Sequence, residues 1–180
     1  MVSREVVADL LRLDDERFSR RVPEALPAHA YDTGRLDRLG DPARPPPDPP
    51  GGSGSLADHE GAFVRRIRVL DDAPLGITLT GPAYADNPVV YANRTFRELT
   101  GYELDDLRGD NLRLLQGTDT APEPVADLRE ALSTWSRTTV ELTNYRRDGT
   151  PFRNRVSIVP VTDPAGSVVN WIGLQRAVEE

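Results

Sequence analysis

The first forty residues have the hydrophobic spacing of helices followed by a stretch without regular pattern. Val2, Val6, Leu10 and Leu13 recur every three or four positions among charged residues, which predicts a short amphipathic helix with these four side chains on one face. Residues 41–55 then consist mainly of Pro, Gly and Ser, a composition typical of a linker. We therefore expect residues 1–40 to form a helical extension and residues 41–55 to form a linker.

A second helical pattern follows the linker. Phe63, Ile67 and Leu70 repeat at helical spacing, and Arg66 with its arginine neighbours is expected on the polar side. We interpret residues 56–71 as a flanking helix that either covers the following domain or pairs with a second copy of the chain.

From residue 72 onward the pattern changes to short apolar runs separated by turn residues. These runs predict strands at 76–80, 89–92, 138–147, 151–162 and 168–178. Between the second and third strands, Asn93 is a suitable N-cap for a helix at 94–100, a short helix is expected at 103–108, and Pro124 marks the start of a longer helix at 124–132. The order indicates an α+β domain over residues 72–178, with a five-stranded antiparallel sheet, helices on one face and a cleft between the layers.

Composition narrows the chemistry of this domain. The formal net charge is −7, which argues against a nucleic-acid partner because a polyanion needs clustered cations. The sequence has no cysteine, so disulfides, thiolate catalysis and cysteine-ligated metals are excluded. We find neither an apolar run long enough to span a bilayer nor a signal-peptide pattern, and we expect no membrane association and a cytoplasmic location.

One nonapeptide and several segments around it carry a family resemblance. The nonapeptide is GDNLRLLQG at Gly109–Gly117, and the accompanying segments are DNPVVYAN at Asp86–Asn93, NYRRDGTPFRN at Asn144–Asn154 and WIGLQ at Trp171–Gln175. Together they resemble the light-oxygen-voltage (LOV) subfamily of PAS domains over about a hundred residues. The resemblance implies a PAS fold preceded by the helical extension.

The same resemblance implies a flavin in the cleft, with FMN favoured over FAD or riboflavin. Arg113 and Arg129 match residues that hold the flavin phosphate, and guanidinium groups suit phosphate oxygens. Asn144 and Asn154 match the amides that bind the pyrimidine edge of the ring. Gln175 matches the glutamine that faces flavin N5 and O4 and carries the signal. Its amide can exchange donor for acceptor by turning over.

The full set of cofactor-binding residues that the resemblance implies contains polar groups at the edges of the flavin and aliphatic groups at its faces. It comprises Asn87, Asn111, Leu112, Arg113, Leu115, Gln116, Val125, Leu128, Arg129, Leu132, Leu142, Asn144, Asn154, Val156, Ile158, Trp171, Gly173 and Gln175. For any one aliphatic member, ordinary core packing explains the residue equally well.

Leu112 occupies the position where the family carries the cysteine that bonds to the flavin in light. That bond therefore cannot form in this chain. The chemistry left open is photoreduction of the flavin to the neutral semiquinone, in which N5 gains a proton and Gln175 reorients. Trp171 stands where the family has a smaller aromatic residue, and either this indole or an external reductant could supply the electron.

Three functions remain open from the sequence. The leading prediction is a cysteine-less blue-light photoreceptor that acts as a homodimer or through a separate output protein. The alternatives are a light-independent flavin redox sensor and a PAS interaction module without cofactor. We expect no enzyme, because no nucleophile and base are paired and no metal-ligand cluster is present in the sequence.

Overall fold

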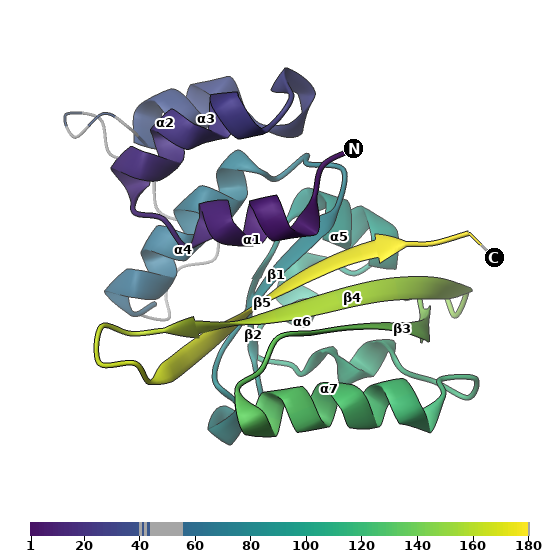
Figure 1. The fold of residues 1–180 in the computed structure, drawn as a ribbon. Coiled ribbons are helices and arrows are strands. Elements are labelled where there is room, and N and C mark those ends of the chain that lie inside the picture. The colour runs from purple at the N-terminus through teal and green to yellow at the C-terminus, as the bar shows by residue number, and fades with distance from the viewer. Residues whose placement is uncertain (40, 42, 44–55, 180) are drawn as a thin grey trace. The chain divides into compact units, whose positions relative to one another are not determined.

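The computed structural model describes residues 1–39, 41, 43 and 56–179, and the chain forms two compact units, Met1–Pro74 and Leu75–Glu180 (Figure 1). Most of the predicted linker at 41–55 lies outside the described residues. The predicted flanking helix belongs to the first unit, together with the helices of residues 1–39. We call the two parts the N-terminal unit and the C-terminal unit.

All the regular elements among the described residues of the N-terminal unit are helices. Its elements are α1 (Arg4–Leu11), α2 (Asp15–Ala25), η1 (Ala28–Ala30), α3 (Thr33–Leu39) and α4 (Asp58–Val69). The predicted face of the first helix was wrong, because Val6 is exposed and the buried side chains include Val7, Leu10 and Leu11. Helix α1 ends before Leu13 because Asp14 begins a new helix, accepting a hydrogen bond from the Arg17 N–H at 2.8 Å.

Arg66 of α4 is buried, contrary to the prediction that it lies on the polar side of the helix. Its Nη1 donates to Asp15 Oδ1 at 2.7 Å and its Nε donates to the Leu11 carbonyl at 3.0 Å. Burial lowers the pKa of Arg66 from its ordinary value, and the hydrogen bond and charge of Asp15 oppose that shift. The guanidinium thus joins α4 to the α1–α2 junction.

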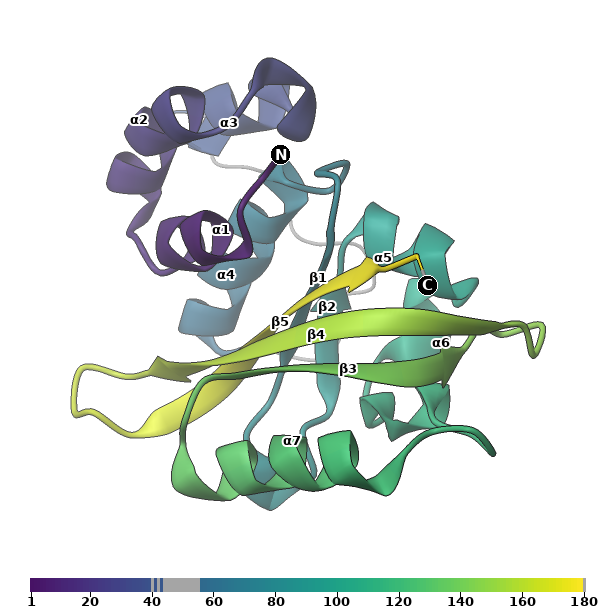
Figure 2. The same ribbon diagram turned by 45° about the vertical axis from the view of Figure 1, so that its right-hand side comes forward.

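The C-terminal unit is a five-stranded antiparallel sheet with helices, as predicted. The strands are β1 (Gly76–Thr80), β2 (Val89–Ala92), β3 (Thr138–Tyr145), β4 (Pro151–Thr162) and β5 (Val168–Ala177), in the spatial order β2-β1-β5-β4-β3 (Figure 2). The central pairing of β1 with β5 joins the two ends of the domain sequence. Side chains alternate between the two faces of the sheet, so Thr78 and Thr80 share one face while Ile77 and Leu79 share the other.

The connection from β2 to β3 supplies the helical layer. It contains α5 (Arg94–Thr100), α6 (Leu104–Leu107), η3 (Leu112–Leu115) and α7 (Pro122–Thr134), and η2 (Ala83–Ala85) lies between β1 and β2. Asn93 caps α5 as predicted: its Oδ1 accepts from the N–H groups of Phe96 at 3.0 Å and Ile77 at 2.8 Å. Helix α7 packs along β3, and this packing sets the width of the space between helix and sheet (Figure 2).

Candidate functional site

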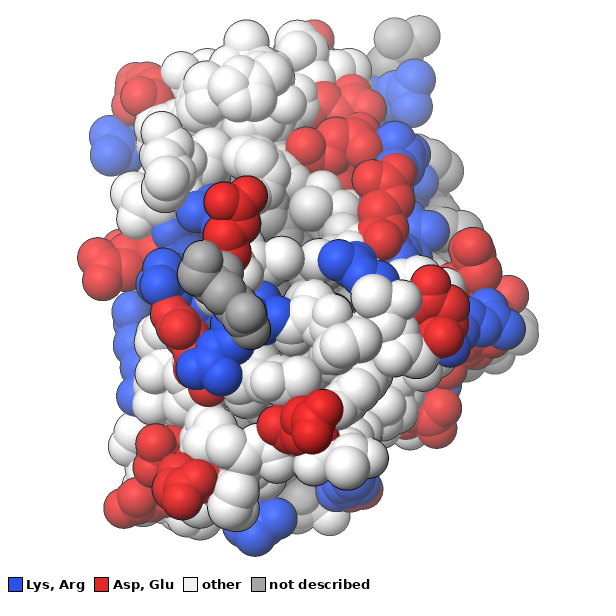
Figure 3. Space-filling view, turned by 90° about the vertical axis from the view of Figure 1, so that its right-hand side faces the viewer, with Lys and Arg blue, Asp and Glu red and all other residues white. Residues whose placement is uncertain are grey.

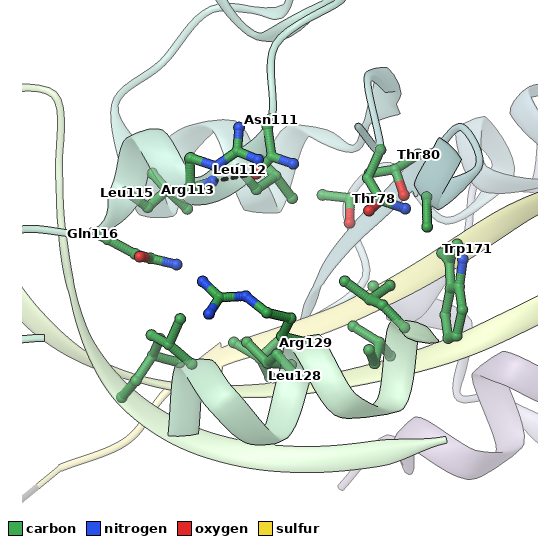
Figure 4. Close-up of a pocket in the computed structure, with 18 of the residues that line it drawn as sticks. Thr78, Thr80, Asn111, Leu112, Arg113, Leu115, Gln116, Leu128, Arg129 and Trp171 are labelled. Carbon is green, nitrogen blue, oxygen red and sulfur yellow. Dashed lines mark hydrogen bonds between the residues drawn. The ribbon is translucent and has the colours of Figure 1, made fainter. Parts of the chain in front are cut away.

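A cavity of about 490 Å³ lies between the sheet and the segments η2, η3 and α7 of the C-terminal unit (Figure 4). This volume is within the range of about 300–1,000 Å³ that is usual for small-molecule sites. All the residues that the sequence predicted for the site line this cavity except Asn154. Whether they bind a flavin stays a prediction.

Aliphatic side chains form the two broad walls. Leu142 and Val156 of the sheet form a buried cluster with Val140, and Val125 and Leu128 of α7 pack against it. Leu112 and Leu115 of η3 line the same cavity (Figure 4). These aliphatic side chains give the cavity an apolar lining that suits the faces of a ring system.

Three amides form a hydrogen-bonded row across β3, β4 and β5. Asn154 donates through Nδ2 to Asn144 Oδ1 at 2.8 Å and to Gln175 Oε1 at 2.9 Å. Asn144 in turn donates to the Leu115 carbonyl at 3.3 Å. All three amides are at most 4% exposed. Asn154 does not line the cavity because it lies between the other two and holds them in place.

Three buried polar atoms on this face of the sheet have no hydrogen-bond partner among the described residues. They are Thr78 Oγ1, Asn154 Oδ1 and Trp171 Nε1. An unpaired buried polar group costs about 1–3 kcal/mol, so native proteins rarely keep several of them together. Thr78 and Trp171 line the cavity and Asn154 belongs to the amide row beside it, so these unpaired atoms fit a polar ligand such as the edge of a flavin.

Two glycines keep the cavity and its border open. A Cβ on Gly173 of β5 would overlap Thr78 Oγ1, and a Cβ on Gly117 would overlap the Tyr145 ring. Tyr145 also accepts a hydrogen bond from the Asp119 N–H at 2.9 Å, which ties the segment after η3 to β3. The Gly117 backbone and the Tyr145 ring approach each other at a distance that only glycine permits.

Charged side chains gather at the open end of the cavity. Arg113 of η3 is 58% exposed and forms a two-pronged ion pair with Asp86, which adopts a left-handed conformation with φ of 65°. Asn111 donates to the Asp86 carbonyl at 2.7 Å, so η3 clasps the Asp86–Asn87 turn. Arg129 of α7 points across the opening toward Gln116 and has no ion-pair partner in the described parts of the chain (Figure 4).

Arg113 and Arg129 differ in the ligand-free site, because Arg113 is already paired with Asp86. On the face shown in Figure 3, arginines and carboxylates are likewise interspersed. An exposed ion pair of this kind is worth about 0–1 kcal/mol, so a dianion can displace Asp86 at small cost.

Sequence reasoning missed five residues that line the cavity: Thr78, Thr80, Ala83, Asp86 and Ser133. Thr78 and Thr80 alternate in the predicted strand at 76–80, and this period-two hydroxyl pattern was the signal available for them. Asp86 was within a recognised segment but was interpreted only as part of a turn.

Two searches of the described residues gave negative results. Outside residues 40, 42, 44–55 and 180, no three His, Cys, Asp or Glu side chains are grouped as metal ligands. Over that same part of the chain, none of the helices has the length and apolar character required to cross a membrane.

The family follows from comparison with known proteins. A family model described as "PAS domain" matches residues 74–180, so the chain belongs to the PAS family. A solved structure described as "Flavin Analogue Sheds Light on Light-Oxygen-Voltage Domain Mechanism" is 42% identical, with a TM-score of 0.57 over 59% of this chain and 78% of that one. The LOV domain of the Erythrobacter litoralis EL346 blue-light-activated histidine kinase is 31% identical, with a TM-score of 0.56 over 59% of this chain and 98% of that domain. Within the PAS family, the chain is a LOV domain that lacks the adduct-forming cysteine.

Curated relatives include a transcriptional activator, a histidine kinase and a photoreceptor. The bacterioopsin transcriptional activator of Halobacterium salinarum is 35% identical over 89% of this chain and 22% of its own length. Blue-light-activated histidine kinase 1 of Erythrobacter litoralis is 44% identical over 61% of this chain and 30% of its own length. The blue-light photoreceptor of Listeria monocytogenes is 37% identical over 62% of this chain and 44% of its own length. The chain thus spans less than half of each of these relatives.

Proposed function

We propose that this chain is a flavin-binding blue-light sensor that holds FMN noncovalently and signals without a cysteinyl bond. The observation that carries the proposal is the set of unpaired polar atoms on buried Thr78 and Trp171, which line the cavity, and on Asn154 of the amide row. In a pocket that binds no ligand, these buried unpaired groups would destabilise the fold without a compensating hydrogen bond. The relatives named as blue-light photoreceptors and blue-light-activated kinases support light as the input.

The charged opening supports a phosphorylated flavin. Arg129 is available for the phosphate, and Arg113 can exchange Asp86 for it. A charge-assisted hydrogen bond is worth about 1.5–3 kcal/mol, so the two arginines favour FMN over riboflavin. The Gln116 amide, toward which Arg129 points, suits the hydroxyls of the ribityl chain.

The amide row supplies the response to light. A flavin held by these residues would supply light-driven redox chemistry in which its N5 could change from a hydrogen-bond acceptor to a donor, and Gln175 is the residue that we assign to respond to that change. Gln175 Oε1 now accepts from Asn154, which leaves Nε2 on the side of Gly173 in the cavity. Turning the amide over presents the oxygen to the ligand and Nε2 to Asn154, and Asn154 can accept it with its unpaired Oδ1 by turning as well.

Turning the Gln175 and Asn154 amides over would also change contacts within the sheet. Asn154 cannot turn without breaking its bond to Asn144, and Asn144 is linked to the Leu115 carbonyl. Gln175 lies opposite Gly76 of β1 and Val156 of β4, so its strand contacts both neighbours at this point. We propose that β5 transmits the change to a second copy of the chain or to an output protein or region.

Trp171 is the proposed internal electron donor. Its side chain is 2% exposed and lines the cavity (Figure 4). We expect Trp171→Phe to slow the loss of the oxidised flavin spectrum under blue light and to leave the dark spectrum of bound flavin in place. An unchanged rate would assign the electron to another source.

The proposal is tested by the absorption spectrum of the purified protein with FMN, in darkness and after blue illumination without oxygen. A structured flavin band that converts to the one-electron-reduced, N5-protonated form supports it, and failure to take up FMN overturns it in favour of an interaction module. Reduction in darkness by a physiological reductant, with no added effect of light, would favour the redox sensor.

Gln175→Leu separates the chemistry from the signal. We expect this variant to bind FMN and to be photoreduced, but to lose the light-minus-dark change in hydrogen exchange of β4 and β5. The matched variant is Leu112→Cys, which supplies a thiol at the family position and is expected to form the cysteinyl bond in light.

A further inference from the structure

Thr78 is a buried hydroxyl that the proposed function has not yet used. The side chain is 0% exposed and its Oγ1 has no hydrogen-bond partner in the described residues. It lies on β1, on the sheet face that lines the cavity, directly opposite Gly173 of β5. A β-branched side chain has few rotamers, so the hydroxyl is held where the strand places it.

The hydroxyl and the Gln175 amide meet around one point. A Cβ on Gly173 would overlap Thr78 Oγ1 and would lie 3.5 Å from Gln175 Nε2. The Thr78 hydroxyl therefore occupies the space that a side chain at position 173 would need, and the Gln175 amide borders the same space. Both groups face the cavity from adjacent strands.

A hydroxyl differs from an amide in how it can respond to a ligand. It donates or accepts by rotating one hydrogen about its C–O bond, whereas an amide must turn its whole end group over. A ligand atom that faces both groups can thus change from acceptor to donor and remain hydrogen-bonded to the hydroxyl.

We propose that Thr78 is a positioning residue of the flavin site, supplying a hydroxyl that competes with the Gln175 amide for the same ligand atom. The proposal rests on the proposed function, since it takes flavin as the ligand and Gln175 as the responding group. When Thr78 holds the ligand atom in both states, the driving force for turning Gln175 over is smaller. Removing the hydroxyl makes the response depend on Gln175 alone.

Thr78→Val tests this because valine has nearly the same shape and no hydroxyl. In the ligand-free protein we expect a higher unfolding midpoint, because an unpaired buried group has been removed. With FMN we expect affinity to fall about 2- to 10-fold, the range for loss of one hydrogen bond, together with a shift in the flavin C4=O infrared band. Thr78→Ser keeps the hydroxyl and should restore both ligand properties.

Thr162→Val is the control, since Thr162 is an exposed threonine of β4 that does not line the cavity. We expect it to leave the C4=O band unchanged. A double-mutant cycle with Gln175→Leu should show coupling between Thr78 and Gln175, and Thr162 should show none. If Thr78→Val does not fold, Thr78→Ala replaces it in the same measurements.

Two failures are distinguishable. If the wild-type protein binds FMN and is photoreduced, but Thr78→Val binds with the same affinity and band position, then Thr78 only fills space and this proposal is overturned while the proposed function stands. If the wild-type protein takes up no FMN, both proposals are overturned together.

Discussion

Arg66 in the N-terminal unit and the amide row in the C-terminal unit are both buried and polar, but they are satisfied differently. Arg66 carries a charge, and Asp15 and the Leu11 carbonyl accept its hydrogen bonds. The amide row is neutral, and Asn154 keeps one oxygen unpaired, as Thr78 on the same face of the sheet keeps its hydroxyl unpaired. A buried charge must be matched by the fold itself, whereas a neutral group can be left for a ligand at moderate cost. The comparison therefore separates a structural polar contact from a binding one.

The largest effect is expected from Asp15→Asn, which leaves the Arg66 charge buried without its carboxylate. We expect the free energy of unfolding to fall by about 2–3 kcal/mol. Glu16→Gln is the control. Glu16 is in the same first turn of α2, but its side chain is 86% exposed and its ion pair with Arg20 is long, at 3.9 Å. Chemical denaturation of both variants, with and without FMN, checks this. If FMN restored the free energy of unfolding of Asp15→Asn to that of the wild-type protein, a purely structural role for Asp15 would be contradicted.

The next largest effect is expected on FMN affinity, at the open end of the cavity, where arginine side chains can contact a ligand. Arg129→Ala is expected to weaken FMN binding by about 1.5–3 kcal/mol, or roughly 10- to 150-fold, and to leave riboflavin binding unchanged. Arg113→Ala should lose less, because Arg113 must first release Asp86. Titration of each variant with both flavins is the measurement. Equal losses for riboflavin would place the arginines away from the phosphate.

The smallest effect on stability is expected at the turn between β3 and β4, where the exposed Asp148 carboxylate accepts hydrogen bonds. Hydrogen bonds from Thr150, first from its side chain and then from its N–H, hold the pKa of Asp148 below its ordinary value of 3.8. The charged carboxylate therefore stabilises the fold above about pH 4, and this contribution is lost as the pH falls through the lowered pKa. Asp148→Asn should unfold at a slightly lower temperature at neutral pH. The difference should vanish in acid, and its persistence there would refute the assignment.

The sequence supported the fold and most of the cavity lining because these depend on local pattern and on one long family signature. The strands at 76–80, 89–92 and 151–162 were predicted with the bounds that the structure shows. Asn93 was identified as a cap because capping is a local contact. A signature, however, names positions without saying which of them touch, so the placement of Asn154 behind Asn144 and Gln175 was missed.

The features that sequence could not supply depend on contacts between distant segments. Arg66 meets Asp15 across 51 residues of chain, and Arg113 meets Asp86 across 27 residues. Helical periodicity places an arginine on the polar side by default, because no local pattern shows that a carboxylate from another helix will meet it. The face of α1 was misassigned for the same reason, since the junction with α2 decides where the helix ends.

The close approach of Thr78 to Gly173 also has a consequence for how this protein can vary through evolution. Adding a side chain at 173 requires position 78 to give up the group that fills the shared space, so neither residue is free to change alone. We expect related sequences to vary at these two positions as a pair, with a residue larger than glycine at 173 accompanied by alanine or glycine at 78. A selection for flavin-coloured colonies from a library randomised at both positions would reveal that covariation directly.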